Sequence, residues 1–173
     1  PTDYAGVVPT PNWNNLLGAS GTQGNLVDYW GANSGATVTW SSNGTWDVGA
    51  INAASGPNFT LMKSHLDPRT PTDATVTVSN LPANLANSLY DVYVYFDADT
   101  ATGQVLSNYT NGSTTYYISD TTTYNGTFVR GTGTTVGTRS AGANYVLFQG
   151  LTGSSFTLFA DSEGFRAEIS GIQ

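Results

Sequence analysis

The stretch of this chain with the most chemical potential is LYDVYVYFDADT, residues 89–100. Alternate side chains of a strand point to opposite faces, so Asp91, Tyr93, Tyr95 and Asp97 share one face, and Asp99 keeps the same parity just beyond. The opposite face is apolar, as expected of the buried side of a strand. Tyrosines two positions apart stand about 7 Å apart along the strand. The sequence therefore predicts one strand face that is half aromatic and half acidic.

Such a face suits a carbohydrate. Sugar rings present apolar C–H patches and a rim of hydroxyls, so their sites combine flat aromatic rings with hydrogen-bond acceptors. A further aromatic, Trp30, follows Tyr29 in a loop rich in Gly and Asn, where an exposed indole suggests a binding role. The predicted site residues are Tyr93, Tyr95 and Trp30 for stacking, and Asp91, Asp97 and Asp99 for accepting hydroxyl hydrogens. The alternative is that a neighbouring loop covers this face.

Catalytic motifs are scarce. The only histidine is His65, there is no cysteine, and the G-x-S-x-G, G-x-G-x-x-G and P-loop patterns are missing from the sequence. We therefore expect a non-enzymatic protein. Paired carboxylates, as glycosidases use them, keep a small glycosidase or lyase open as an alternative. The acidic residues considered for that role are Asp97, Asp99, Asp161, Glu163 and Glu168.

Carboxylates in loops also raise the question of a metal ion. One histidine without cysteines argues against a zinc site. Asp97 with Asp99, or Asp161 with Glu163, could offer oxygen ligands to one structural Ca²⁺. The full calcium-loop pattern fails at Ala101, so solvated loop carboxylates are the competing interpretation.

Composition excludes several partners. The chain has 173 residues, of which only 10% are charged, and its net charge is −7. Scattered bases in an acidic chain argue against binding nucleic acid or an anionic membrane surface. No apolar run approaches the length of a membrane span. A chain kept soluble by hydroxyls and amides is typical of secreted modules, so we expect an extracellular location. Because it starts at Pro1, we expect a mature chain or an excised domain.

Short β-branched or aromatic runs separated by Gly, Asn, Pro and Ser predict about ten strands in one domain, residues 1–173. That pattern indicates an all-β sandwich or barrel. The runs lie at 36–40, 45–51, 59–66, 75–79, 89–100, 114–119, 126–130, 144–148, 155–160 and 165–172. Two of the connections, around Leu81 and Leu151, share a layout and predict equivalent hairpins whose leucine folds into the core. Trp13, Trp40 and Trp46 are expected to pack in the core.

The strand YDVYVYF preceded by SNLP, together with TTYYISD, GTFVRG, NYVLFQGLTGSSFTLFA and the closing FRAEISGIQ, resembles non-catalytic modules of secreted bacterial polysaccharide-degrading enzymes. These are carbohydrate-binding modules of the galactose-binding-like jelly-roll type. The resemblance implies a two-sheet antiparallel jelly roll, often with a structural Ca²⁺, that binds a β-glucan, xylan or similar polysaccharide and is tethered to a catalytic domain. A structural or adhesion module of a bacterial surface protein is the main alternative.

Overall fold

The computed structural model describes residues 3–48, 55–69, 71–97, 105–164 and 166–173. Within them the larger sheet follows the order β1 (Ser20–Gln23), β2 (Thr37–Ser41), β5 (Ala74–Ser79), β12 (Phe156–Ser162), β7 (Val105–Asn111), β8 (Thr114–Asp120) and β10 (Ser140–Ala141). The smaller sheet follows the order β13 (Gly171–Ile172), β6 (Tyr90–Tyr95), β11 (Tyr145–Leu151) and β9 (Arg130–Gly131). A separate pair is formed by β3 (Thr45–Asp47) and β4 (Ser64–Leu66), and the helical turns are α1 (Pro57–Lys63), α2 (Ala83–Ala86) and η2 (Val136–Thr138).

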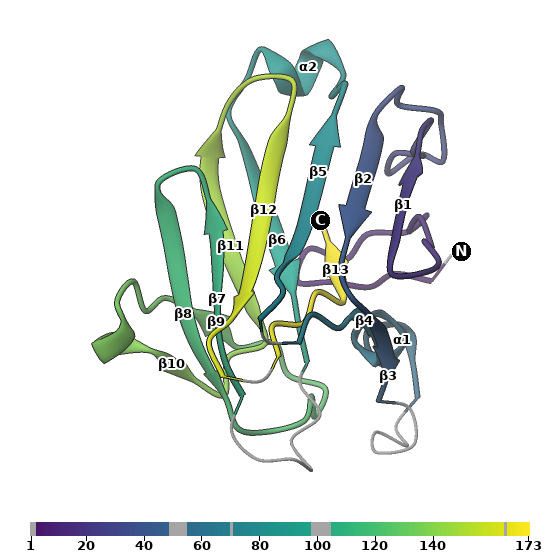
Figure 1. The fold of residues 1–173 in the computed structure, drawn as a ribbon. Coiled ribbons are helices and arrows are strands. Elements are labelled where there is room, and N and C mark those ends of the chain that lie inside the picture. The colour runs from purple at the N-terminus through teal and green to yellow at the C-terminus, as the bar shows by residue number, and fades with distance from the viewer. Residues whose placement is uncertain (1–2, 49–54, 70, 98–104, 165) are drawn as a thin grey trace.

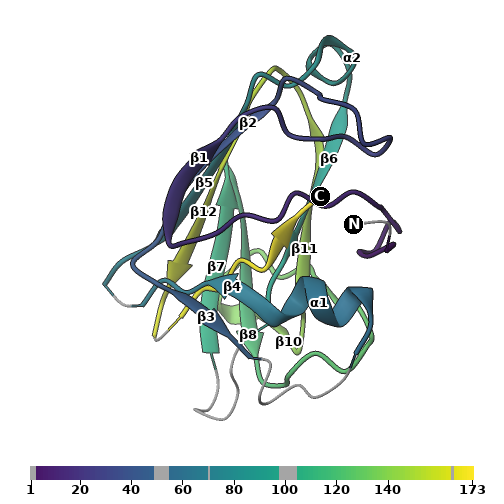
Figure 2. The same cartoon turned by 90° about the vertical axis from the view of Figure 1, so that its right-hand side faces the viewer.

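The two large sheets pack face to face, as Figures 1 and 2 show. Alternate residues of β5, β12 and β6, among them Val76, Leu158 and Val94, fill one core between the sheets. This confirms the expected mostly β, sandwich-like fold. Its strand pairs are antiparallel except for two short edge strands, β9 and β10, which run parallel to β11 and β8. Neither α-helix in the described part of the chain has the length and apolarity needed to cross a membrane.

The two predicted hairpins are instead arches that cross from one sheet to the other. Strand β5 belongs to the larger sheet and β6 to the smaller, and β11 and β12 are divided in the same way. The arches stack, because β5 pairs with β12, β6 pairs with β11, and the Leu81 amide donates to the Ser154 carbonyl at 3.0 Å. Leu81 and Leu151 pack against the core, as predicted. The predicted burial of the two leucines is confirmed. The predicted hairpin pairing is wrong, because the two strands of each unit lie in different sheets.

Residues 59–63 form a helix rather than the predicted strand. Pro57 occupies the first turn of α1, where its fixed φ suits a helix start, and Met62 is buried beneath it. Only Ser64–Leu66 of the predicted run is extended. The helix supplies Phe59, Leu61 and Met62 to a second apolar cluster, which lies on the outer face of β6.

The outward face of the larger sheet is covered mostly by hydroxyls. Threonines on adjacent strands bond across the sheet, with oxygen separations of 3.1 Å for Thr22 and Thr39 and 2.9 Å for Thr77 and Thr157. One large apolar side chain, Phe159, stands among them with 48% of its surface exposed. The inward face of the same strands is apolar, so each strand has the alternation expected of a sheet with one solvated side.

Candidate functional site

The tyrosine-bearing face of β6 is covered at its carboxyl end. Tyr95 has no exposed surface, and its ring packs against Trp13, Phe128 and Tyr145 at centroid distances of 6.2, 5.3 and 6.1 Å. Trp13 belongs to the N-terminal arm, residues 3–19, which crosses this face before β1. Tyr95 is therefore an interior residue, and the open face that the sequence analysis assumed is not found there.

The hydroxyl of Tyr95 anchors this cover. It accepts the Val7 backbone amide at 2.8 Å and donates to the Gln173 side-chain oxygen at 2.6 Å. Burial raises the pKa of the Tyr95 phenol, so it stays a neutral donor. Tyr93, two residues earlier on the same face of β6, is only partly buried. Its ring stacks on that of Tyr145, with centroids 6.1 Å apart.

Asp97 is also fully buried, so the hydroxyl-accepting role predicted for it lacks a route to a surface ligand. Its Oδ1 accepts the Tyr124 backbone amide at 2.8 Å. Burial raises the pKa of the Asp97 carboxyl to about 7, and the nearby Asp120 charge adds to that rise, while the Tyr124 amide opposes it. Asp99 lies outside the described residues.

Asp91 is exposed and contacts β11 at the irregularity in strand pairing between Phe148 and Leu151. Its Oδ1 accepts the Gly150 amide at 2.9 Å, and Gly150 has φ of 67°, which a residue with a side chain adopts only with strain. The predicted acceptor thus stands at the rim of a groove that Gly150 lines.

Trp30 is the predicted stacking residue that the structure leaves open, with 82% of its surface exposed. Tyr29 packs against it edge-on, with ring centroids 4.7 Å apart and planes at 79°. A hydrogen bond to the Tyr4 side chain raises the pKa of the Tyr29 phenol, which places Tyr4 beside the pair. Tyr4, Tyr29 and Trp30 are called the aromatic platform below.

The platform is built on a fixed turn. Asp28 Oδ1 accepts the backbone amides of Trp30 and Ala32 at 2.8 and 2.9 Å, and the Asp28 carbonyl accepts the Gly31 amide at 2.9 Å. The N-terminal arm supports the turn, because the Asn12 side chain donates to the Tyr29 carbonyl at 3.0 Å. An exposed indole is therefore presented on ordered backbone, which reduces the entropy cost of binding a ligand.

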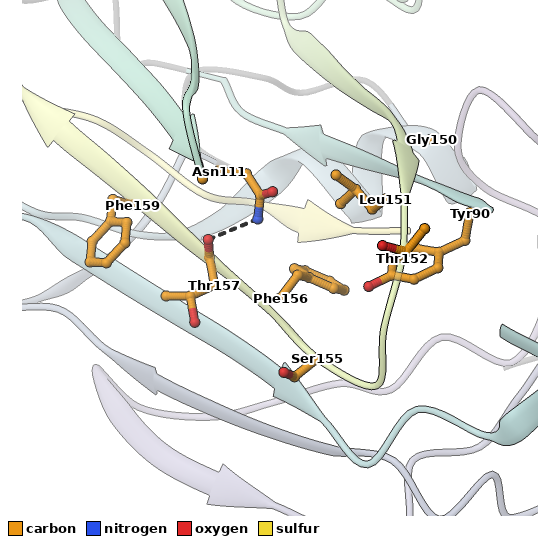
Figure 3. A pocket seen from close by; sticks show the side chains of 10 residues that line it. Tyr90, Asn111, Gly150, Leu151, Thr152, Ser155, Phe156, Thr157 and Phe159 are labelled. Carbon is orange, nitrogen blue, oxygen red and sulfur yellow. Dashed lines mark hydrogen bonds between the residues drawn. The ribbon is translucent and has the colours of Figure 1, made fainter. Parts of the chain in front are cut away.

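A groove of about 550 Å³ lies where β12 extends past the end of β7 (Figure 3). Asn111 and Thr157 lie between Phe159 at one end and a group of Tyr90, Leu151 and Phe156 at the other. The Tyr90 hydroxyl is buried and has no hydrogen-bond partner within the described residues. The groove thus combines exposed aromatic surface, an amide and an unsatisfied hydroxyl, and the sequence analysis did not identify it.

A group of ionisable side chains is buried at the other end of the sandwich. His65, Asp67, Arg166 and Glu168 are each at most 4% exposed. Asp67 pairs with Arg69 at 3.0 Å and with Arg166 at 3.3 Å. Burial raises the pKa of the Glu168 carboxyl to about 8, assisted by the Asp120 and Asp67 charges and opposed by Arg166.

The sequence carries a signal for this group that the sequence analysis did not use. His65-x-Asp67 and Arg166-x-Glu168 both have the two-residue spacing that places side chains on one side of an extended segment. Periodicity could not reveal that the two segments are neighbours. Asp161 and Glu163, the alternative calcium pair, instead accept hydrogen bonds from Asn108 on the outward face of the larger sheet.

Comparison with known proteins gives no relative: no family model, no curated protein and no solved structure matches this chain.

Proposed function

We propose that this domain is a non-catalytic carbohydrate-binding module, a jelly roll of galactose-binding-like type, that binds a plant or microbial polysaccharide through the aromatic platform. The observation that carries the proposal is the 82% exposure of Trp30 on a hydrogen-bonded turn. A large indole exposed to this extent forgoes most of the burial that would stabilise the fold. A ligand with apolar ring faces recovers that free energy.

The platform meets the chemical needs of a pyranose. The indole face of Trp30 offers a stacking surface, and Tyr4 and Tyr29 place phenolic hydroxyls beside it that both donate and accept. The Asp28 carboxylate lies in the turn of the platform, and the Asn12 amide lies in the N-terminal arm that supports this turn. Affinity for one sugar contact is modest, so the module works by tethering a catalytic domain of a secreted enzyme to its polysaccharide.

The groove of Figure 3 is a second surface for the same ligand class. The exposed ring of Phe159 would contact the apolar face of a sugar ring, and the Asn111 amide beside it offers a polar partner. Its rim is ordered by the Asp91 contact to Gly150, which gives Asp91 a supporting role in this proposal.

Affinity electrophoresis against β-glucans, xylans, mannans and galactans tests the proposal. We expect retardation by at least one polysaccharide, and an affinity about fivefold weaker or more in Trp30→Ala, since a stacked ring contributes on the order of 1 kcal/mol or more. Because Trp30 is so exposed, thermal unfolding of the variant should match the wild type. Phe159→Ala tests the groove in the same assay, because it removes an exposed ring there and leaves the platform intact.

The possible outcomes separate the alternatives. Equal binding by wild type, Trp30→Ala and Phe159→Ala would remove both surfaces from the site. A chain that binds no glycan in the panel would be a structural or adhesion module. Release of new reducing ends from the same polysaccharides would identify a glycosidase or lyase.

A further inference from the structure

Two segments far apart in the sequence pair edge to edge at the end of the sandwich where β3 and β4 lie (Figure 1). Leu66 and Ile169 exchange backbone hydrogen bonds of 3.0 and 3.3 Å, and Arg69 and Arg166 form a second antiparallel bridge. This register places Asp67 directly opposite Glu168. Like charges directly opposite each other destabilise a strand pair unless something between them compensates.

The described interior also has an excess of carboxyl groups. Asp67, Asp97, Asp120 and Glu168 are all at most 2% exposed, whereas Arg166 is the buried guanidinium of the described residues. Arg166 and the half-exposed Arg69 both contact Asp67. Glu168 is stabilised less by its neighbours than Asp67 is. Its Oε1 is buried and has no hydrogen-bond partner among the residues that the structure describes. A buried carboxylate without a partner is costly, so the Glu168 carboxyl either keeps its proton or requires a cation beside it.

We propose that His65, Asp67 and Glu168 bind a divalent transition-metal ion of the Zn²⁺ type. One ligand atom from each of these side chains lies within 4.8 Å of the other two. In a tetrahedral site with ligand bonds of about 2.0–2.2 Å, two ligand atoms on one ion lie about 3.3–3.6 Å apart, so these side chains must approach each other by up to about 1.5 Å to complete the site. The proposal requires rotation of these side chains to supply this shift while the strands stay in place.

The donor set determines the class of ion. An imidazole nitrogen with two carboxylates suits Zn²⁺ and related ions, whereas Ca²⁺ requires six to eight oxygens. Three protein ligands leave one tetrahedral position for water. Both Asp67 oxygens already contact an arginine, but each carboxylate oxygen has a second lone pair, so Asp67 can bind the ion and keep its ion pairs.

The ion would act as a structural link. His65 lies on β4 and Asp67 immediately follows it, while Glu168 lies in the segment that leads to β13. Metal binding would therefore connect the β3–β4 pair to the closing segment of the chain, and it would stabilise the native state by mass action. This role is independent of glycan binding at the aromatic platform.

The test uses the wild-type chain after treatment with a chelator, because His65 is its only histidine and gives one set of imidazole NMR signals. Addition of one equivalent of ZnCl₂ should shift or broaden these signals, and calorimetry should give one site. At a hundredfold excess over the dissociation constant, the thermal midpoint should rise by about 5 °C or more. Imidazole signals that neither shift nor broaden with equimolar Zn²⁺, or that change equally with CaCl₂, would overturn the proposal.

A ligand variant and a matched control complete the experiment. Glu168→Gln keeps the side-chain shape and removes the anionic ligand, so we expect at least about tenfold weaker Zn²⁺ binding. Asp47→Asn removes an exposed carboxylate from the partner strand β3, and it should bind Zn²⁺ as the wild type does. Equal loss of affinity in both variants would indicate adventitious surface binding and refute the site. If Glu168→Gln does not fold, the wild-type imidazole signals decide the question alone.

Discussion

The Tyr95 hydroxyl lies 2.6 Å from the Gln173 side-chain oxygen and 2.8 Å from the Val7 amide, so one phenol on β6 joins the N-terminal arm to the residue that follows β13. The Gln173 side chain continues the connection by donating to the Val8 carbonyl at 2.5 Å. The same arm carries Asn12, which supports the turn beneath Trp30. Tyr95, which was expected to stack on sugar, is therefore a buried residue that holds the arm, and the arm in turn supports the platform through Asn12.

Removing this hydroxyl should loosen the arm. Tyr95→Phe leaves the Val7 amide and the Gln173 oxygen without their partner, so we expect the free energy of unfolding to fall by about 1–3 kcal/mol. Urea denaturation measures the change. Tyr93→Phe is the control, because Tyr93 is only partly buried, and its cost should stay below about 0.5 kcal/mol. Equal costs for the two variants would mean that the Tyr95 contacts do not hold the arm.

The Asp28 carboxylate should control how well Trp30 is presented. Asp28→Ala removes the acceptor of the Trp30 and Ala32 amides, so both amides should exchange faster with solvent and glycan affinity should fall several-fold. NMR-detected hydrogen exchange measures the first effect independently of any ligand. Asp28→Asn keeps an oxygen acceptor and should restore both properties. Unchanged exchange in Asp28→Ala would show that the turn does not depend on this carboxylate.

Strand β1 should depend on the absence of a side chain at Gly21. A Cβ atom there would lie 2.6 Å from the Trp40 ring, so Gly21→Ala should cost about 1–3 kcal/mol through overpacking. Gly24→Ala, just beyond the same strand, would place its Cβ at an ordinary 3.6 Å from the Thr37 hydroxyl and should cost less than about 0.5 kcal/mol. Thermal or urea unfolding of the two variants distinguishes these expectations. A harmless Gly21→Ala would mean that Trp40 repacks freely.

Asp97 should give the unfolding free energy a dependence on pH. Its pKa is near 3.8 in the unfolded chain and about 7 in the folded one, so between these values the native state holds a proton that the unfolded state has released. The contribution of Asp97 to stability is therefore largest below about pH 4 and is lost as the pH rises toward 7, by at most about 1.4 kcal/mol per pH unit.

Asp97→Asn should reduce that slope, because an amide imitates the protonated carboxyl and its oxygen can still accept the Tyr124 amide. Urea titrations at a series of pH values from 4 to 7 measure it. The exposed carboxylate of Asp91 provides the control, and Asp91→Asn should keep the wild-type slope. Identical pH profiles for all three proteins would exclude Asp97 as the source.

Strand composition predicted most of the sandwich. The runs at 36–40, 75–79, 114–119, 144–148 and 155–160 became β2, β5, β8, β11 and β12, because β-branched and aromatic residues alternate there with polar ones. Strands β1 and β7 were missed, since β1 has the sequence SGTQ with no apolar side chain, and polar residues interrupt the apolar ones in β7, VLSNYTN. The run at 59–66 was assigned the wrong structure because its apolar residues fit both periods.

The candidate site was predictable only in part. Local sequence identified Trp30 in a polar loop, and the structure leaves it exposed. Periodicity also grouped Tyr95 with Asp91 on one face of β6, but it could not indicate that Trp13, from 82 positions earlier in the chain, covers Tyr95 and not Asp91. Burial by distant segments is a tertiary effect, and the Asp67–Glu168 contact arises in the same way.

The place of β12 in the larger sheet has a consequence for biosynthesis. This strand lies between β5 and β7, although both neighbours precede it in the chain. While the polypeptide emerges from a ribosome, β5 and β7 therefore lack their common partner until residue 162 is available. The sheet cannot close progressively from its first strand, so the domain is expected to acquire its structure late and as a unit, with its nascent edges exposed to chaperones or to mispairing until then.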